Sequence, residues 1–162
     1  MSPENTEKLI TTYPLLYREL RDRVFECGDG WFNLVWQVSA EIETAAQLEG
    51  IPKTAEAWPS VGVLKEKFGT LRVQFRTRVS EAIEALVAKA YERSMGACEL
   101  CGAPARLDRE RDLGKWEEAL CESCRKVHRS PPRTQDTNRD ASCRATDSQS
   151  RHYLKGATNE KT

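Results

Sequence analysis

Two Cys-x-x-Cys pairs constrain the fold of this chain more than any other feature. The first pair is Cys98 with Cys101, the second is Cys121 with Cys124, and nineteen residues separate the pairs. Zn²⁺ prefers four thiolate or imidazole ligands in a tetrahedron, and each Cys-x-x-Cys turn can direct two sulfurs toward one point. We therefore predict that these four cysteines bind one structural zinc ion. Disulfides or a redox pair are disfavoured, because no secretory signal or thioredoxin-like pattern accompanies the cysteines.

The residues around the pairs indicate the architecture of this zinc module. Gly102 permits a tight knuckle after the first pair, and the residues after Cys124 can form a helix that ends before Pro131. Residues 103–107 and 116–120 can form a short hairpin around Gly114. This order of knuckle, hairpin and helix is typical of a treble clef, and a zinc ribbon is the alternative. His128 is an alternative to Cys124 as the fourth ligand.

The chain before the module mixes two hydrophobic periodicities. Apolar residues recur at helical spacing near residues 9–13, 15–24, 31–45 and 83–91. Asp29 and Ser80 are expected N-caps, and Gly50 is expected to end the second long helix. Residues 71–76 alternate strictly between apolar and polar, and Phe68-Gly69 supplies a turn. We predict an α+β fold: a small helical domain packed on a β-hairpin, with a C-terminal treble-clef or zinc-ribbon-like module.

The net charge divides the chain. It is zero for the 162 residues, but residues 1–124 carry 16 basic and 21 acidic groups, whereas residues 125–162 carry 9 and 4. The last segment also has almost no large apolar residues, so it cannot bury enough surface to offset its ordering entropy. We predict a helical and β-hairpin core at 1–95, a zinc-binding module at 96–129, and a polar basic tail at 130–162 that is disordered or ordered by a partner.

Few residues offer catalytic chemistry. A nucleophilic cysteine needs an activating base, and the two histidines, His128 and His152, both lie within or after the zinc module. Cys27 is therefore expected to be a buried structural residue, and Cys143 a free thiol. Glu26 and Asp29 can form an acid/base or cation-binding pair, but helix termination and capping explain them better. The sequence favours a protein that is not an enzyme.

The expected hairpin carries a basic face, and a loop carries an isolated aromatic residue. Positive side chains on one sheet face can follow a phosphate backbone or an acidic partner. Trp58 lies between prolines in a loop and is the tryptophan expected to be exposed as an interface anchor. The candidate nucleic-acid or partner-binding residues are Lys65, Lys67, Arg72, Arg76, Arg78 and Trp58.

No long apolar segment is present in the sequence. The longest uncharged stretch, residues 30–40, is too short and too polar for a membrane helix, which needs about 20 apolar residues. The first residues have no basic and apolar pattern of a secretory signal. We therefore expect a cytoplasmic protein without a membrane partner.

A set of motifs along residues 10–128 resembles a group of small uncharacterised phage and prophage proteins. The motifs are Tyr13-Pro14, the segment ECGDGW at residues 26–31, the segment KEKFGTLR at residues 65–72, and the C-terminal cysteine module. The polar tail after His128 departs from the short ending expected of that group. The resemblance implies a bacterial host cell, and no catalytic residues follow from it.

These observations favour a non-enzymatic, phage-encoded zinc protein that binds and modulates a host protein or ribonucleoprotein, host defence systems among them. A nucleic-acid-binding zinc protein that uses the basic hairpin and tail is the alternative. A metal-dependent nuclease is disfavoured, because no histidine precedes the module to activate water.

Overall fold

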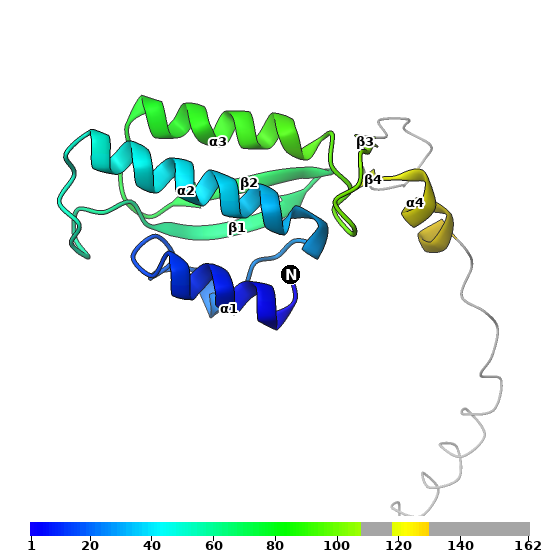
Figure 1. The fold of residues 1–162 in the computed structure, drawn as a ribbon, viewed down its shortest axis with the longest axis horizontal. Coiled ribbons are helices and arrows are strands. Elements are labelled where there is room, and N and C mark those ends of the chain that lie inside the picture. Colours follow the sequence, from blue (N-terminus) through cyan, green and yellow to red (C-terminus); the bar gives the residue numbers. More distant parts are fainter. Residues whose placement is uncertain (108–117, 130–162) are drawn as a thin grey trace, which may run out of the picture. The chain divides into compact units, whose positions relative to one another are not determined.

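A computed structural model describes residues 1–107 and 118–129 of the chain. Met1–Arg129 form one compact unit of helices and a two-stranded antiparallel hairpin, which confirms the α+β fold class (Figure 1). The predicted hairpin turn around Gly114, the free thiol predicted at Cys143 and the predicted 130–162 tail lie outside the described residues. Within the described part of the chain, every helix is too short or too polar to cross a membrane.

Three longer helices pack with the hairpin around one core. Helix α1 spans Pro3–Thr12 and is capped by Ser2, α2 spans Phe32–Leu48, and α3 spans Glu81–Ser94. The Ser80 hydroxyl accepts the N–H of Ile83, as the capping pattern predicted. Gly50, with φ of 69°, follows the end of α2, also as predicted. Short 3₁₀ turns at Arg21–Arg23 and Asp29–Trp31 complete the N-terminal half.

The hairpin consists of β1, Val61–Lys67, and β2, Thr70–Phe75. Phe68 and Gly69 both have positive φ, which is the backbone of the tight turns that match the twist of paired strands. The register shifts between Val61 and Val63, so Gly62 is the extra residue of a bulge. On the other edge of β1, Glu26 pairs in parallel with Lys65.

The core lies between the helices and the inner face of the hairpin. Trp31, Val35 and Ile42 from α2 and its preceding turn are at most 1% exposed, and so is Leu64 from β1. Tyr17 packs edge to face on Phe25, with ring centroids 4.8 Å apart. The Tyr17 hydroxyl also lies 2.6 Å from the Ser39 hydroxyl, which satisfies two buried polar groups.

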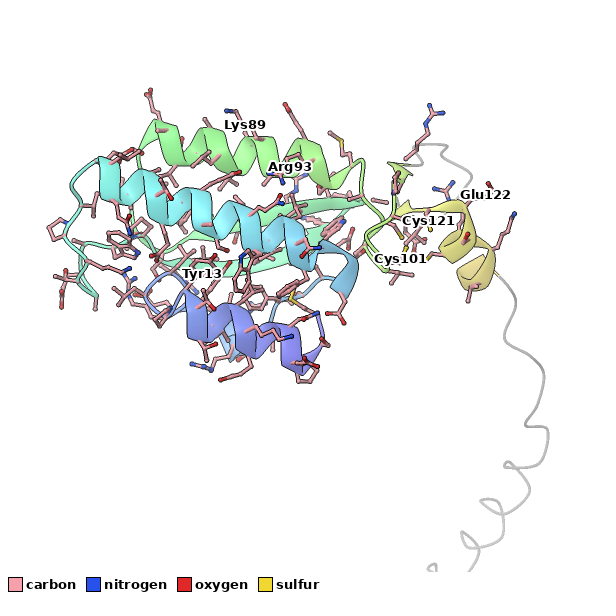
Figure 2. All side chains as sticks on the ribbon, viewed as in Figure 1. Tyr13, Lys89, Arg93, Cys101, Cys121 and Glu122 are labelled. Atoms are coloured by element: carbon pink, nitrogen blue, oxygen red, sulfur yellow. The ribbon has the colours of Figure 1, made fainter. Side chains whose placement is uncertain are left out.

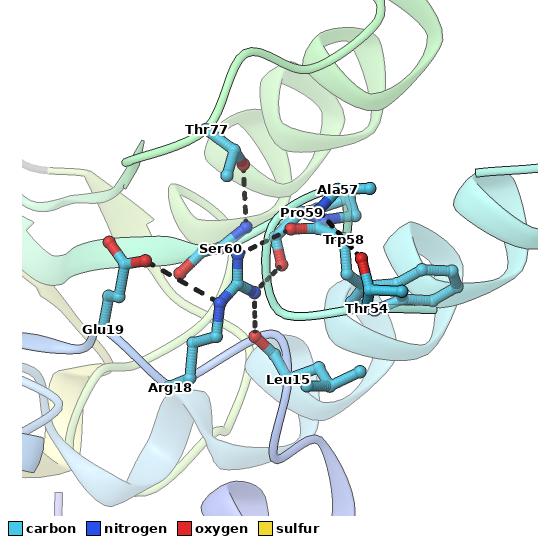
Figure 3. A network of polar contacts seen from close by, with 9 residues as sticks. All are labelled: Leu15, Arg18, Glu19, Thr54, Ala57, Trp58, Pro59, Ser60 and Thr77. Carbon is cyan, nitrogen blue, oxygen red and sulfur yellow. Dashed lines mark hydrogen bonds and ion pairs between the residues drawn. The ribbon is translucent and has the colours of Figure 1, made fainter. Parts of the chain in front are cut away.

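The expected helical continuation after Pro14 is wrong. Residues 14–19 form turns, and only the short 3₁₀ turn follows them. The reason is tertiary: the Arg18 guanidinium donates to the carbonyls of Leu15, Trp58 (2.9 Å) and Pro59 (3.2 Å), as Figure 3 shows. Arg18 thereby joins this turn to the 51–60 loop. The apolar residues at helical spacing in this segment are therefore explained by their burial and not by a helix.

Candidate metal centre

The C-terminal module has the element order predicted for a treble clef. The knuckle at residues 98–102 is followed by β3, Arg106–Leu107, which pairs antiparallel with β4, Ala119–Leu120. Helix α4, Glu122–Arg129, comes next, and Cys124 lies in its first turn. Figure 2 shows Cys101 and Cys121 close together beside the start of this helix.

The structure brings the four predicted cysteines to one point. The sulfurs of Cys98, Cys101, Cys121 and Cys124 all lie within 4.8 Å of one another. The Cys101 and Cys121 sulfurs are 3.6 Å apart. In a tetrahedral thiolate site with metal–sulfur bonds of about 2.3 Å, neighbouring sulfurs are separated by about 3.8 Å. The four cysteines could therefore hold one metal ion with little rearrangement.

The electrostatics of the cluster favour a bound cation. Burial by itself raises the pKa of Cys98, but backbone N–H groups of Cys121 and Cys101 outweigh it and hold that pKa at about 6. The neighbouring sulfurs of Cys101 and Cys121 raise the pKa of Cys124 to about 12. Four thiolates at these distances therefore require a positive charge among them, which a divalent metal supplies.

The knuckle docks on the turn that precedes α2. The Gly28 N–H donates to the Glu99 carboxylate (2.8 Å), and the Gly30 N–H donates to the Glu99 carbonyl (2.7 Å). The Trp31 indole N–H donates to the Ala97 carbonyl at 2.9 Å. Three donors from residues 28–31 thus hold residues 97–99, which fixes the first cysteine pair against the core.

This docking requires glycine on the core side. A Cβ atom at Gly30 would lie 2.2 Å from the Cys98 carbonyl oxygen and 2.4 Å from the Gly102 nitrogen. A Cβ atom at Gly28 would lie 2.4 Å from the Glu99 carbonyl oxygen. Both contacts are with backbone atoms, which cannot move aside as a flexible side chain can. The Cys-Gly-Asp-Gly sequence is therefore the receptor surface for the metal knuckle.

The structure gives the three residues considered for catalysis other roles. Burial raises the pKa of Cys27 to about 12, which keeps its thiol protonated and unreactive. The Glu26 carboxylate accepts from the Arg21 guanidinium (3.1 Å). Asp29 is not the N-cap of α2: its carboxylate accepts from the Ser2 N–H (2.7 Å) and the Asn5 amide (3.0 Å). Those hydrogen bonds lower the pKa of Asp29.

The predicted partner-binding residues separate into two groups. Lys65 and Lys67 lie on β1 and Arg72 on β2, while Arg76 directly follows β2 and Arg78 is exposed in the loop beyond it. Trp58 is not exposed: it is 1% accessible, and its indole N–H donates to Glu43 (2.7 Å). Its expected role as an exposed anchor is wrong, because the Arg18 contacts fold the proline-rich loop onto the core.

Sequence reasoning missed Glu99 and the pairing of the two glycines with the knuckle. Glu99 lies between the first two cysteines, where a side chain usually faces solvent, yet it is half-buried and receives the Gly28 N–H. The signal in the sequence was the pair of glycines flanking Asp29. That spacing indicates close backbone approach, but it does not identify the approaching segment.

His128 belongs to α4, and its side chain lies outside the described part of the chain. The alternative in which it replaces Cys124 therefore stays a prediction. Comparisons of this chain with protein-family models, with curated proteins and with solved structures find no significant match.

Proposed function

We propose that this chain is a non-enzymatic zinc-binding protein that binds and modulates a protein or ribonucleoprotein of a bacterial host. The observation that carries the metal assignment is the cluster of four cysteine sulfurs within 4.8 Å. A thiolate-only tetrahedral donor set is typical of structural zinc, and four protein ligands leave no open coordination position for substrate or water. The zinc would fix the knuckle that docks on residues 28–31, so metal binding would add to the folding free energy.

The roles of the acidic residues and of Cys27 favour binding over catalysis. Arg21 holds Glu26, the start of α1 holds Asp29, and burial protects Cys27. The residues that offered acid/base or nucleophilic chemistry therefore support the fold. The motif set at residues 10–128 is the support for a phage origin and for a host target, with bacterial defence systems as one class of target.

Metal analysis tests the zinc assignment. Protein purified from bacterial cytoplasm without chelators is expected to contain about one zinc per chain. Cys98→Ser is expected to lose that zinc, whereas the matched control Cys27→Ser, which changes a thiol outside the cluster, is expected to keep it. Wild-type protein without zinc would overturn the metal assignment.

Affinity capture from bacterial lysate, with and without nuclease, tests the binding function. Retention of one host component in stoichiometric amount supports the proposal. If nuclease treatment releases the captured component, the partner is a ribonucleoprotein. If the component stays bound after nuclease treatment, the partner is a protein. Metal-dependent cleavage of a substrate that Glu26→Gln or Asp29→Asn abolishes would instead make the chain an enzyme.

A further inference from the structure

The β-hairpin separates its charges by face. Lys65 on β1 is directly opposite Arg72 on β2, and alternation along the strands places both on the outer face, away from buried Leu64 and Leu71. The only carboxylate within residues 61–76 is Glu66, which alternation places on the inner face, where it accepts the Gly69 N–H (2.6 Å). The outer face comprises Val63, Lys65, Lys67, Arg72, Gln74 and Arg76, while Thr70, opposite Lys67, is buried.

The four cations of this outer face are not neutralised by the rest of the described structure. None of Lys65, Lys67, Arg72 and Arg76 forms an ion pair with any residue in the ranges 1–107 and 118–129. Glu26, which pairs with Lys65 at the edge of β1, is bound by Arg21. Like charges directly opposite each other destabilise a sheet. An anionic ligand bound between Lys65 and Arg72 would offset the repulsion between them.

Two of the cations are supported by their surroundings. The Arg72 guanidinium lies over the ring of Tyr91, 4.8 Å from its centroid, and Arg72 is exposed to solvent. The Arg76 side chain lies across Gly62, where a Cβ atom would come within 2.4 Å of its Nε. The bulge glycine therefore provides the space that Arg76 occupies, and less rotamer entropy is lost when these side chains bind a ligand.

An exposed aromatic residue stands at one end of the outer face. Phe68, in the hairpin turn, is 49% exposed and has a φ of 55°, a conformation that bulky residues rarely adopt. The Lys67 ammonium lies 5.2 Å from the centre of its ring. Asparagine or glycine would suit this turn better, so local stability does not explain a phenylalanine here.

We propose that this outer face binds the phosphate backbone of a single-stranded nucleic acid, with Phe68 and Arg72 stacking on bases. Basic side chains interleaved with stacking groups are the recurring features of such sites. A duplex fits less well: a two-stranded ribbon reads the major groove by entering it, whereas the other face of this hairpin is buried against the helices. The inference rests on the proposed function only in treating the chain as a binding protein, because the outer face contains no metal ligand.

Fluorescence anisotropy with labelled oligouridine and oligodeoxythymidine of about 12 nucleotides tests this proposal on the full chain. Binding to either oligonucleotide at low salt is expected, since they share the phosphate backbone, and the tighter one identifies RNA or DNA as the ligand. The variant Lys65→Gln/Arg72→Gln is expected to bind roughly tenfold more weakly and to reduce the log–log salt slope by about 1.4.

Two further variants separate charge from stacking. Phe68→Asn suits the positive φ and is expected to lower affinity about fivefold or more without changing the salt slope. Lys8→Gln/Lys89→Gln removes two exposed cations from α1 and α3 and is the matched control, expected to bind as the wild type does. Far-ultraviolet circular dichroism and zinc content are expected to be unchanged in every variant.

Several results would overturn the inference. These are no oligonucleotide binding at low salt, equal binding by wild type and Lys65→Gln/Arg72→Gln, or duplex binding as tight as single-strand binding. If the wild-type chain captures a host protein even after nuclease treatment and Lys65→Gln/Arg72→Gln does not, this face is a protein interface. Wild-type protein that purifies without zinc but still binds oligonucleotide would refute the metal assignment and leave this inference standing.

Discussion

At the scale of single residues, Gly30 is packed against backbone so closely that a Cβ atom there would lie 2.2 Å from the Cys98 carbonyl oxygen. Its missing side chain lets the knuckle carbonyl of Cys98 and the nitrogens of Cys101 and Gly102 approach its Cα closely. The Gly30 N–H also donates to the Glu99 carbonyl. Gly30 therefore contributes both a donor and the space that the metal knuckle occupies.

Gly30→Ala is expected to destabilise the protein by about 2 kcal/mol or more, because its Cβ would meet three backbone atoms within 2.6 Å. Zinc affinity is expected to fall with it, since the displaced segment carries two ligands. Urea unfolding and competition with a chelator measure these effects. Gly96→Ala is the control: its Cβ would find the nearest atom at 3.7 Å, so its stability is expected to match the wild type. Equal unfolding free energies and equal zinc affinities for Gly30→Ala and Gly96→Ala would contradict the docking of the knuckle on residues 28–31.

At the scale of elements, some segments follow from local pattern and others do not. The hairpin and α3 have the bounds that alternation and capping indicate, because turn chemistry and the Ser80 cap are satisfied by neighbours in sequence. Residues 15–24 have helical periodicity but form turns and a short 3₁₀ segment. There the backbone is held by distant partners: the Leu16 carbonyl accepts the Val61 N–H at 2.8 Å, and Arg18 binds the 58–59 carbonyls.

Arg18→Met is expected to destabilise the protein by about 2–4 kcal/mol, because it leaves part-buried carbonyls of Leu15, Trp58 and Pro59 without their donor. Methionine keeps the unbranched stem, so the loss reports hydrogen bonds more than packing. Tryptophan fluorescence during unfolding follows the effect. Arg21→Met, which removes an exposed arginine from the same region, is expected to change stability by less than about 1 kcal/mol. A loss of similar size in both variants would argue against the role given to Arg18.

At the scale of the whole molecule, the zinc module and the core are expected to unfold together. Hydrogen bonds from Gly28, Gly30 and Trp31 join the knuckle to the turn before α2, and Ala119 of β4 belongs to the buried core cluster. Metal removal would therefore loosen the first cysteine pair and the N-terminal end of α2 together. The compact unit extends from Met1 through Arg129.

Chelation of the metal is expected to lower the melting temperature of the core, including helix content far from the cysteines, in a single transition. Circular dichroism and intrinsic tryptophan fluorescence are expected to give the same midpoint, since Trp31 hydrogen-bonds directly to the knuckle. Re-addition of zinc is expected to restore the original midpoint. A core that melts at the same temperature with and without metal would show that the docking adds no stability.

The sequence by itself determined the features whose causes are local. The Cys-x-x-Cys motifs identify the four sulfur ligands, alternation with Phe68-Gly69 defines the hairpin, and Ser80 defines the start of α3. The interactions within each motif, turn and cap come from neighbours a few residues away, whereas the Cys101 and Cys121 sulfurs meet from twenty residues apart. Tertiary structure alone decided that residues 28–31 receive the knuckle, about seventy residues later in the chain, and that Trp58 is buried. Those outcomes depend on contacts between backbone groups far apart in the sequence, and the spacing of residues along one chain does not identify such contacts.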